Sequence, residues 1–210
     1  MDKTKQFIKL FKKAEKKYGK SERRLAAEGL KKDWQVLITT IMSAQSRDET
    51  TIKIANQLFK KYLSLISLSK AKYSQVYKIF RGLNYNKTKA KNVIACAKML
   101  VSEFKGKIPT SIEELIRLPG VGRKTANLVL SEVHKKDSIT IDTHCFRLLN
   151  VLGIVHTKNP HQTELEMTKI APKKYWSKIN RIFVLWGKDV RGRDKKKLLD
   201  SLRNRQSLTF

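Results

Sequence analysis

The sequence predicts an all-α fold, because apolar residues recur with helical spacing along most of the chain and helix-breaking residues are scarce. Its 210 residues include 4 Pro and 9 Gly, few for a turn-rich sandwich or barrel. The segment Ser138–Ile141 is strand-like, but it is too short to pair into a sheet. We therefore expect helices joined by short turns.

The helices are expected in the following order. The basic N-terminal segment predicts a surface helix with Phe7, Ile8 and Phe11 directed inward; the alternative is a helix that lies on a membrane surface. Apolar stripes of helical period follow within 36–41, 52–62, 76–80 and 93–104, and further helices are expected over 113–118, 123–134, 143–152, 162–170 and 175–186. The polar, basic end of the chain has a weak leucine stripe (198, 199, 202), which indicates a short helix or a frayed tail.

Charge is the strongest bulk signal. Lys and Arg number 46 against 18 Asp and Glu, which gives a formal net charge of +28. Such an excess opposes compact folding through self-repulsion, so we expect a polyanionic partner. Nucleic acid fits best, because each neutralised phosphate releases counterions. A generally lysine-rich proteome is the alternative explanation.

Several classes of protein are disfavoured. Cys96 and Cys145 lie among apolar residues without C-x-x-C spacing, so they are expected to be buried free thiols in a reducing compartment. No H-x-x-x-H pair is present, so we expect no metal site. No apolar run approaches the roughly 18 residues that span a bilayer, and no targeting segment is evident. We expect no membrane partner and, for a prokaryotic source, a cytoplasmic, nucleoid-associated protein.

The segment 111–136 is the most informative. Ser111 and Glu114 have capping-box spacing, so a helix should begin there. The run Gly120-Val121-Gly122 predicts a tight hairpin into a second helix that opens with Arg123. The free N–H groups at such a helix start suit a DNA phosphate, and we expect these four residues to bind DNA. The alternative is an ordinary turn that contacts only water.

Lys124 is the candidate nucleophile. The second helix has its buried face at Ala126, Val129, Leu130 and Val133, and Lys124 projects from roughly the opposite face. In the first turn of a helix the dipole disfavours an ammonium ion, and only a neutral amine attacks an electrophile. The alternative is a solvated surface lysine, which is what most first-turn lysines are.

Asp142 is the candidate carboxylate. It follows the apolar Ser138–Ile141 segment and precedes a helix whose inward residues include Cys145, Leu148 and Leu149. This position predicts an N-cap, which contributes about 1 kcal/mol. The hydrogen bonds that a capping carboxylate accepts favour its charged form, which suits a group facing a developing cation. Asp142 is therefore expected to hold both roles.

Three segments together resemble the endonuclease III family of helix-hairpin-helix DNA glycosylases. They are WQVLITTIMSAQSRDE (34–49), LPGVGRKTANLVL (118–130) and IDTHCFRLLN (141–150), in which Asp142 follows Lys124 by 18 positions. The resemblance extends from about residue 5 to about residue 190. It implies a two-lobed α fold with DNA bound in a cleft between the lobes. A six-helix barrel would cover residues 26–136, with the hairpin motif at about 112–134, and residues 1–25 and 137–210 would form the second domain.

The resemblance also implies a reaction. Lys124 would attack the anomeric carbon of a flipped nucleotide, expel the damaged base and form a Schiff base that permits β-elimination. Asp142 would stabilise the cationic sugar. Related enzymes that do not nick the strand usually carry Tyr or Ser at the position of Lys124, so lysine favours the bifunctional enzyme. The implied function is base-excision repair, most readily of oxidised pyrimidines in double-stranded DNA, by a monomer. His144 and Arg147 match the motif as supporting residues.

Two further residues match the family's duplex-opening positions. Gln45 matches the residue that fills the vacated space, and Leu83 matches the wedge that opens the base stack. The loop after Leu83 is two residues longer than the common form, so Leu83, Asn84 and Tyr85 all remain candidates for the wedge.

The chain departs from the family at its C-terminal end. Most members hold a four-iron cluster with four cysteines spaced C-x6-C-x2-C-x5-C, whereas this chain has no cysteine after Cys145. We therefore expect no cluster and no cofactor. Lys188, Arg191 and Arg193 are expected to supply the DNA-backbone contacts instead. The resemblance also allows a monovalent cation at the hairpin carbonyls, which the residues themselves do not predict.

Other functions remain open from the sequence. A glycosylase for oxidised guanine or mismatched thymine, or an abasic-site lyase with little base preference, would carry the same two catalytic residues. A non-catalytic helix-hairpin-helix DNA-binding protein needs neither Lys124 nor Asp142. An RNA-binding protein is disfavoured because Trp34, Trp176 and Trp186 are scattered and form no stacking surface.

Overall fold

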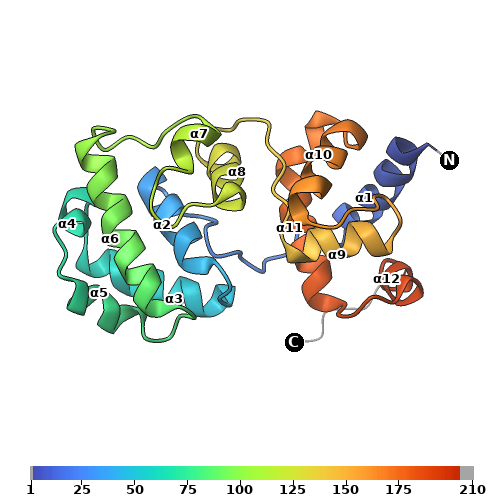
Figure 1. Cartoon of the computed structure of the whole chain (residues 1–210). Coiled ribbons are helices and arrows are strands. Elements are labelled where there is room, and N and C mark those ends of the chain that lie inside the picture. The colour runs from blue at the N-terminus through green and yellow to red at the C-terminus, as the bar shows by residue number, and fades with distance from the viewer. Residues whose placement is uncertain (1, 204–210) are drawn as a thin grey trace. The chain divides into compact units, whose positions relative to one another are not determined.

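The computed structural model describes residues 2–203, and every regular element in that range is a helix (Figure 1). In order these are α1 (Lys3–Tyr18), α2 (Asp33–Ser43), α3 (Asp48–Lys61), α4 (Leu65–Ser69), α5 (Tyr73–Phe80), α6 (Asn86–Ser102), α7 (Ile112–Leu115), α8 (Arg123–Glu132), α9 (Thr143–Val151), α10 (Pro160–Ile170), the 3-10 turn η1 (Lys173–Tyr175), α11 (Trp176–Asp189) and α12 (Lys195–Ser201). The predicted all-α fold is confirmed.

The chain divides into two compact units. The first runs from Arg24 to Lys136 and contains α2 to α8. The second combines the chain up to Arg23 with the chain from Asp137 onward, and contains α1 and α9 to α12. The sequence placed these boundaries at residues 26 and 136. Residue 1 and residues 204–210 of the expected second domain lie outside the described range.

The first unit is organised around α2 and α6. Helix α6 packs against α2, α4 and α5, and α2 packs in addition against α3 and α8 (Figure 1). Residues Val36 to Met42 of α2 are all buried, which explains why this helix is apolar on every side rather than amphipathic. The packing of α2 on α8 brings together two helices that lead to predicted site residues, because α2 leads directly into Gln45 and α8 carries Lys124.

The second unit is held by an aromatic core. Helix α11 packs against α9 and α1, and the rings of Phe7, Phe11, Tyr175 and Phe183 meet between them, with Phe11 and Tyr175 centroids 4.9 Å apart. The inward direction of Phe7 and Phe11 is confirmed, whereas Ile8 is half-buried. Because the apolar face of α1 is used in this core, it is not available to a membrane. Across residues 2–203 no helix is long and apolar enough to cross a bilayer.

Candidate functional site

The predicted hairpin joins α7 to α8 in the first unit. The Ser111 hydroxyl caps α7 and accepts a hydrogen bond from the Glu114 N–H at 3.2 Å, so the expected helix start is confirmed. The Val121 N–H then donates to the Leu118 carbonyl at 3.0 Å and closes the turn. Leu118 and Val121 both point into the core of the unit, which anchors the hairpin from below.

The two hairpin glycines have different surroundings. Gly120 has a φ of +82°, and a Cβ there would lie 3.0 Å from side-chain atoms of Asn92 and Ile41. Glycine at this position therefore serves both the left-handed turn and the close packing of the hairpin on the unit. A Cβ on Gly122 would meet nothing within 4 Å. The bare backbone at Gly122 instead leaves its outer surface open to a close approach from outside.

Val121, also expected to bind DNA, is the packed residue of the hairpin. It is 6% exposed, and its N–H donates to the Leu118 carbonyl. Val121 holds the hairpin in place, and the exposed residues Gly120, Gly122 and Arg123 are the ones that face outward.

Lys124 is exposed in the first turn of α8, as the helical spacing predicted. Ala126 and Val129, both fully buried, fix α8 on the core, and Leu130 is 6% exposed. Val133, expected on the same face, is only partly buried because the helix ends at Glu132. Lys124 is thus an exposed residue, two positions after Gly122, on a helix that packs against the core.

Asp142 lies in the second unit as the N-cap of α9. Its Oδ1 atom accepts a hydrogen bond from the Cys145 N–H at 2.8 Å, and the residue is 8% exposed. The predicted capping role is confirmed. The preceding segment is irregular and buried, as expected for a segment too short to pair, and the Asn180 side chain donates to the Thr140 carbonyl at 3.2 Å. Asp142 is therefore fixed from both sides.

Arg147 closes the turn that follows α11. Its Nη2 atom donates to the carbonyls of Gly187 and Val190, each at 2.9 Å, and its Nη1 atom donates to the carbonyl of Gly192. Burial lowers the pKa of the Arg147 guanidinium, although Asp142 opposes this effect. One planar side chain thus donates to three carbonyls and fixes the course of residues 187–192. We call this arrangement the Arg147 clamp.

His144 packs against the same turn. A Cβ on Gly187 would lie 2.5 Å from the imidazole Nδ1 of His144, so only glycine fits beneath the ring. Burial is the main cause of the lowered pKa of His144; Asp142 opposes it, and Arg147 and Lys188 add to it. Together with the clamp, this contact agrees with the supporting role expected for both residues.

The predicted basic segment, residues 188–193, includes two of the carbonyls that Arg147 holds. Arg191 and Arg193 are exposed on either side of the clamped Gly192, and Lys188 is half-buried. Asp189 forms an ion pair with Arg23 at 2.6 Å. The Arg147 clamp therefore presents two exposed arginines on a fixed backbone.

The residues predicted to open the duplex lie on two adjacent loops of the first unit. Gln45 is exposed and has a φ of +53°, which is uncommon for a residue with a side chain. Leu83, in contrast, is 3% exposed and belongs to the core of the unit. Of the three candidates for the wedge, Leu83 is thus packed in the core, whereas Asn84 and Tyr85 are exposed. Tyr85 is 66% exposed, with a φ of +54°.

Sequence reasoning missed Lys89, on α6 just beyond this loop. It is 5% exposed, and its Nζ atom donates to the Ser46 hydroxyl at 2.8 Å. The available signal was its register: Lys89, Val93, Cys96 and Leu100 share one face of α6, and the last three are fully buried. A lysine in an apolar stripe indicates a buried amine.

The residues present do not fit the iron-sulfur cluster that the resemblance associates with the family. Such a cluster needs four thiolates, and the chain has two cysteines, Cys96 in the first unit and Cys145 in the second. Both are fully buried, and burial raises the pKa of the Cys96 thiol to about 12. Within residues 2–203, no group of three or more His, Cys, Asp or Glu could hold a metal ion.

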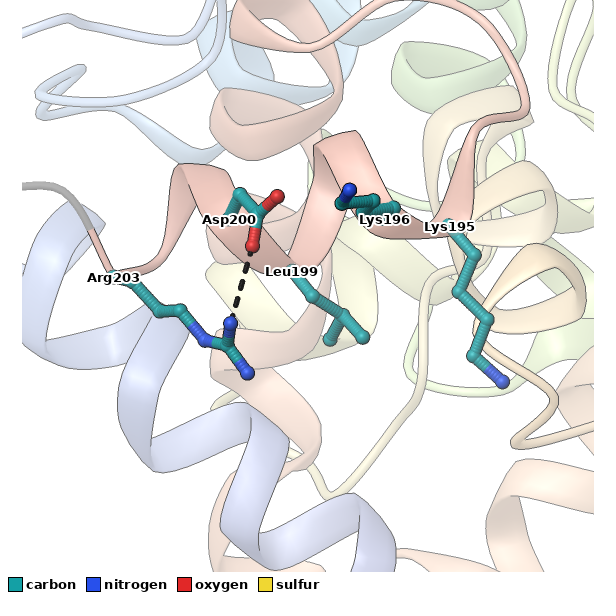
Figure 2. A pocket seen from close by; sticks show the side chains of 5 residues that line it. All are labelled: Lys195, Lys196, Leu199, Asp200 and Arg203. Atoms are coloured by element: carbon teal, nitrogen blue, oxygen red, sulfur yellow. Dashed lines mark hydrogen bonds and ion pairs between the residues drawn. The ribbon is translucent and has the colours of Figure 1, made fainter.

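A surface hollow lies beside α12 (Figure 2). It is lined by Lys195, Lys196, Leu199, Asp200 and Arg203, and Arg203 pairs with Asp200 at 3.3 Å across one helical turn. All five residues come from one short helix and its end. The hollow contains none of the predicted site residues.

The chain is similar to known DNA repair proteins. Residues 38–173 match the model for "HhH-GPD superfamily base excision DNA repair protein". Endonuclease III of Thermotoga maritima is 39% identical over 157 residues, which cover 75% of this chain and 74% of that protein. Endonuclease III of Synechocystis sp. is 33% identical over 157 residues, covering 74% of this chain and 72% of that protein.

The fold is similar to solved structures as well. A trapped covalent intermediate of endonuclease III with DNA superposes with a TM-score of 0.83 at 26% identity, covering 91% of this chain and 89% of that one. A non-covalent complex of endonuclease III with DNA gives a TM-score of 0.81 at 27% identity, covering 88% and 86%.

Proposed function

The chain belongs to the HhH-GPD superfamily of base excision DNA repair proteins, and from this membership we propose which of its residues carry the reaction. It is a DNA glycosylase with abasic-site lyase activity, and it binds DNA. We infer that Lys124 is the nucleophile and that the enzyme is bifunctional. The observation that carries this inference is that Lys124 is exposed in the first turn of α8, directly after the hairpin at Gly122.

The reaction follows from amine chemistry. The neutral Lys124 amine attacks the anomeric carbon of the flipped nucleotide, and the bond to the damaged base breaks with its electron pair leaving on the base. The adduct opens to a Schiff base between Lys124 and the sugar. Loss of a proton from C2′ then expels the 3′ phosphate by β-elimination, and water releases the sugar from Lys124. The proton that the attacking amine loses neutralises the departing base, the ring oxygen takes up a proton as the ring opens, and hydrolysis restores the free Lys124 amine.

Asp142 supports the first step through its charge. The sugar acquires positive character as the base leaves, and a fixed carboxylate stabilises this character without having to reorganise. Its capping bond to the Cys145 N–H supplies that fixation. The proposal therefore assigns two roles to one side chain, a structural role in α9 and an electrostatic role toward the substrate.

Two loops of the first unit open the duplex. We assign the plug to Gln45 and the wedge to Tyr85, because Tyr85 is the exposed large side chain of its loop and Leu83 is not. Removing a base from the stack costs a few kcal/mol, and an inserted ring recovers part of this by stacking on the neighbouring bases. An aromatic wedge offers a larger stacking surface than a leucine does.

The remaining contacts are electrostatic. The hairpin backbone at Gly120, Gly122 and Arg123 would bind one phosphate, and Lys188, Arg191 and Arg193 would bind others. The Arg147 clamp takes the place of a metal cluster in holding this basic segment, so the enzyme is proposed to work without a cofactor, as a monomer.

The preferred substrate is proposed to be double-stranded DNA that contains an oxidised pyrimidine. The test is borohydride trapping, because borohydride reduces a Schiff base to a stable protein–DNA bond. The duplex would carry one oxidised pyrimidine, and the variants would be Lys124→Ala and, as a matched exposed lysine of the same unit, Lys107→Ala. A band in the wild type and in Lys107→Ala, but not in Lys124→Ala, supports the proposal.

Other trapping results would change the proposed substrate or contradict the assignment of Lys124. A band that appears only with an abasic duplex keeps Lys124 as the lyase residue and moves the search to oxidised guanine or mismatched thymine. A band that persists in Lys124→Ala, or no band on any duplex, overturns the assignment of Lys124.

A further inference from the structure

Lys89 is buried on a face of α6 whose other buried residues are apolar. Lys89 lies in the first turn of α6, on the face that carries the buried Val93 and Leu100. It is 5% exposed, and burial lowers its pKa to about 8. The start of a helix is also an unfavourable place for a positive charge. A methionine would fill the same space without either penalty, so the amine itself needs an explanation.

The amine is directed at one hydroxyl group. Lys89 Nζ donates to Ser46 Oγ at 2.8 Å, and the same oxygen accepts a second hydrogen bond from the Asn84 N–H at 3.2 Å. The Asn84 side-chain amide in turn donates to the Gln45 carbonyl at 2.5 Å. These bonds connect the loop after α2 with the loop before α6, and the partners are 38 to 43 residues apart in the chain. We call them the Lys89–Ser46 clasp.

The clasp is located where the backbone is strained. Gln45 and Tyr85 are two of the four residues other than glycine that have a positive φ within residues 2–203. Both lie directly beside clasp residues, since Gln45 precedes Ser46 and Tyr85 follows Asn84. A positive φ costs energy at a residue that has a side chain, so this conformation persists only where surrounding contacts stabilise it. The clasp supplies such contacts at both positions, and the Lys89 N–H adds a backbone bond to the Tyr85 carbonyl at 2.9 Å.

We propose that Lys89, acting through Ser46, is a positioning residue that fixes Gln45 and Tyr85 as one pre-arranged pair for insertion into a damaged duplex. This inference rests on the proposed function, in which those two side chains open the base stack. Lys89 does not touch the reacting sugar. It acts by removing the need to order two loops at the moment when the duplex opens.

The test compares two substrates that differ in whether the stack must be opened. One is a fully paired duplex with an oxidised pyrimidine. The other is a duplex with an abasic site flanked by unpaired bases, in which the stack is already open. The variants are Lys89→Met and Ser46→Ala, with Lys91→Met as the matched control, because Lys91 is an exposed lysine of the same helix. The rate of borohydride trapping is measured on both duplexes, and thermal unfolding verifies that each variant is folded.

We expect Lys89→Met and Ser46→Ala to be trapped about ten- to a hundredfold more slowly on the paired duplex, the range that misplacement of a working group produces. On the pre-opened duplex we expect trapping close to the wild-type rate, and Lys91→Met should match the wild type on both. An equal loss on the two duplexes, or no loss on either, overturns the role of Lys89. Absence of trapping by the wild type on both duplexes is a different result, because it overturns the proposed function itself.

Discussion

His144 lies so close to Gly187 that a single added carbon atom between them would sit 2.5 Å from the imidazole Nδ1. This contact joins the first turn of α9, where Asp142 is the cap, to the end of α11, where the Arg147 clamp begins. The carboxylate that we propose to be catalytic and the basic segment are thus connected by packing contacts within the second unit.

Gly187→Ala is therefore expected to destabilise the protein. In an open helix this substitution would stabilise by about 1 kcal/mol, because alanine is the better helix former. Here the added methyl group must displace the ring and the Cβ of His144, and overpacking of that kind costs about 1–3 kcal/mol. We expect the steric effect to prevail and the melting temperature to fall. In a His144→Ala background the two ring contacts are gone and only the contact with the Cβ of residue 144, at 2.8 Å, remains, so Gly187→Ala should cost clearly less stability there. If both backgrounds gave the same loss, the His144 contact would not be the cause.

Asp142→Asn separates the two roles of this residue. Asparagine caps helices about as well as aspartate, so stability should change by no more than about 0.5 kcal/mol. The charge is lost, however, and the rate of borohydride trapping should fall about a hundredfold. Asp142→Ala should show the same loss of rate together with about 1 kcal/mol of destabilisation, measured by chemical unfolding. Normal trapping by Asp142→Asn would leave Asp142 with the capping role alone.

The basic segment is tested by the dependence of DNA affinity on salt. Each phosphate contact contributes about 0.9 to the slope of log K against log salt. Replacing Lys188, Arg191 and Arg193 together by Gln should therefore lower the slope by up to about 3. The control replaces three exposed lysines of α1, Lys12, Lys13 and Lys16, which changes the net charge equally. An unchanged slope for the first set, or an equal change for both sets, would contradict the assignment.

The buried amine of Lys89 predicts a specific effect of pH on stability. Its pKa is about 8 in the folded protein and takes the ordinary value of 10.5 when the chain unfolds. Between these values the unfolded chain binds a proton that the folded chain does not, so stability rises as the pH rises through this window. The full effect is about 3 kcal/mol, at about 1.4 kcal/mol per pH unit.

The measurement is the difference in unfolding free energy between Lys89→Met and the wild type, from chemical denaturation between pH 7 and pH 10.5. This variant lacks the titrating amine, so its advantage over the wild type should be largest near pH 7 and should shrink as the pH rises. Lys91→Met should differ from the wild type by a constant amount. A constant difference for Lys89→Met as well would mean that Lys89 is not desolvated.

Structural features that depend only on residues close in the sequence could be predicted. The helix starts at Ser111 and Asp142 and the exposed position of Lys124 follow from spacing within one or two turns, and the structure agrees with each. The burial of Leu83 was not predictable, because in a lengthened loop the helical period gives no register for deciding which residue turns inward.

Polar contacts between residues far apart in the sequence could not be predicted from helical spacing either. Arg147 was expected only as a supporting residue, and its three carbonyl partners lie 40 to 45 positions away. Nothing in local spacing selects them. The Lys89–Ser46 bond spans 43 positions, so only the presence of Lys89 in an apolar stripe could be read beforehand.

The left-handed backbone at Gln45 and Tyr85 has a consequence for how this protein can change under selection. Glycine relieves such a conformation, and asparagine tolerates it, by roughly 1 kcal/mol or more per position. Variants with Gly or Asn at 45 or 85 are therefore readily reached gains in stability. Each of them would also remove a side chain that we propose to enter DNA. Under the proposed roles, selection for thermal robustness and selection for repair therefore favour different residues at these two positions.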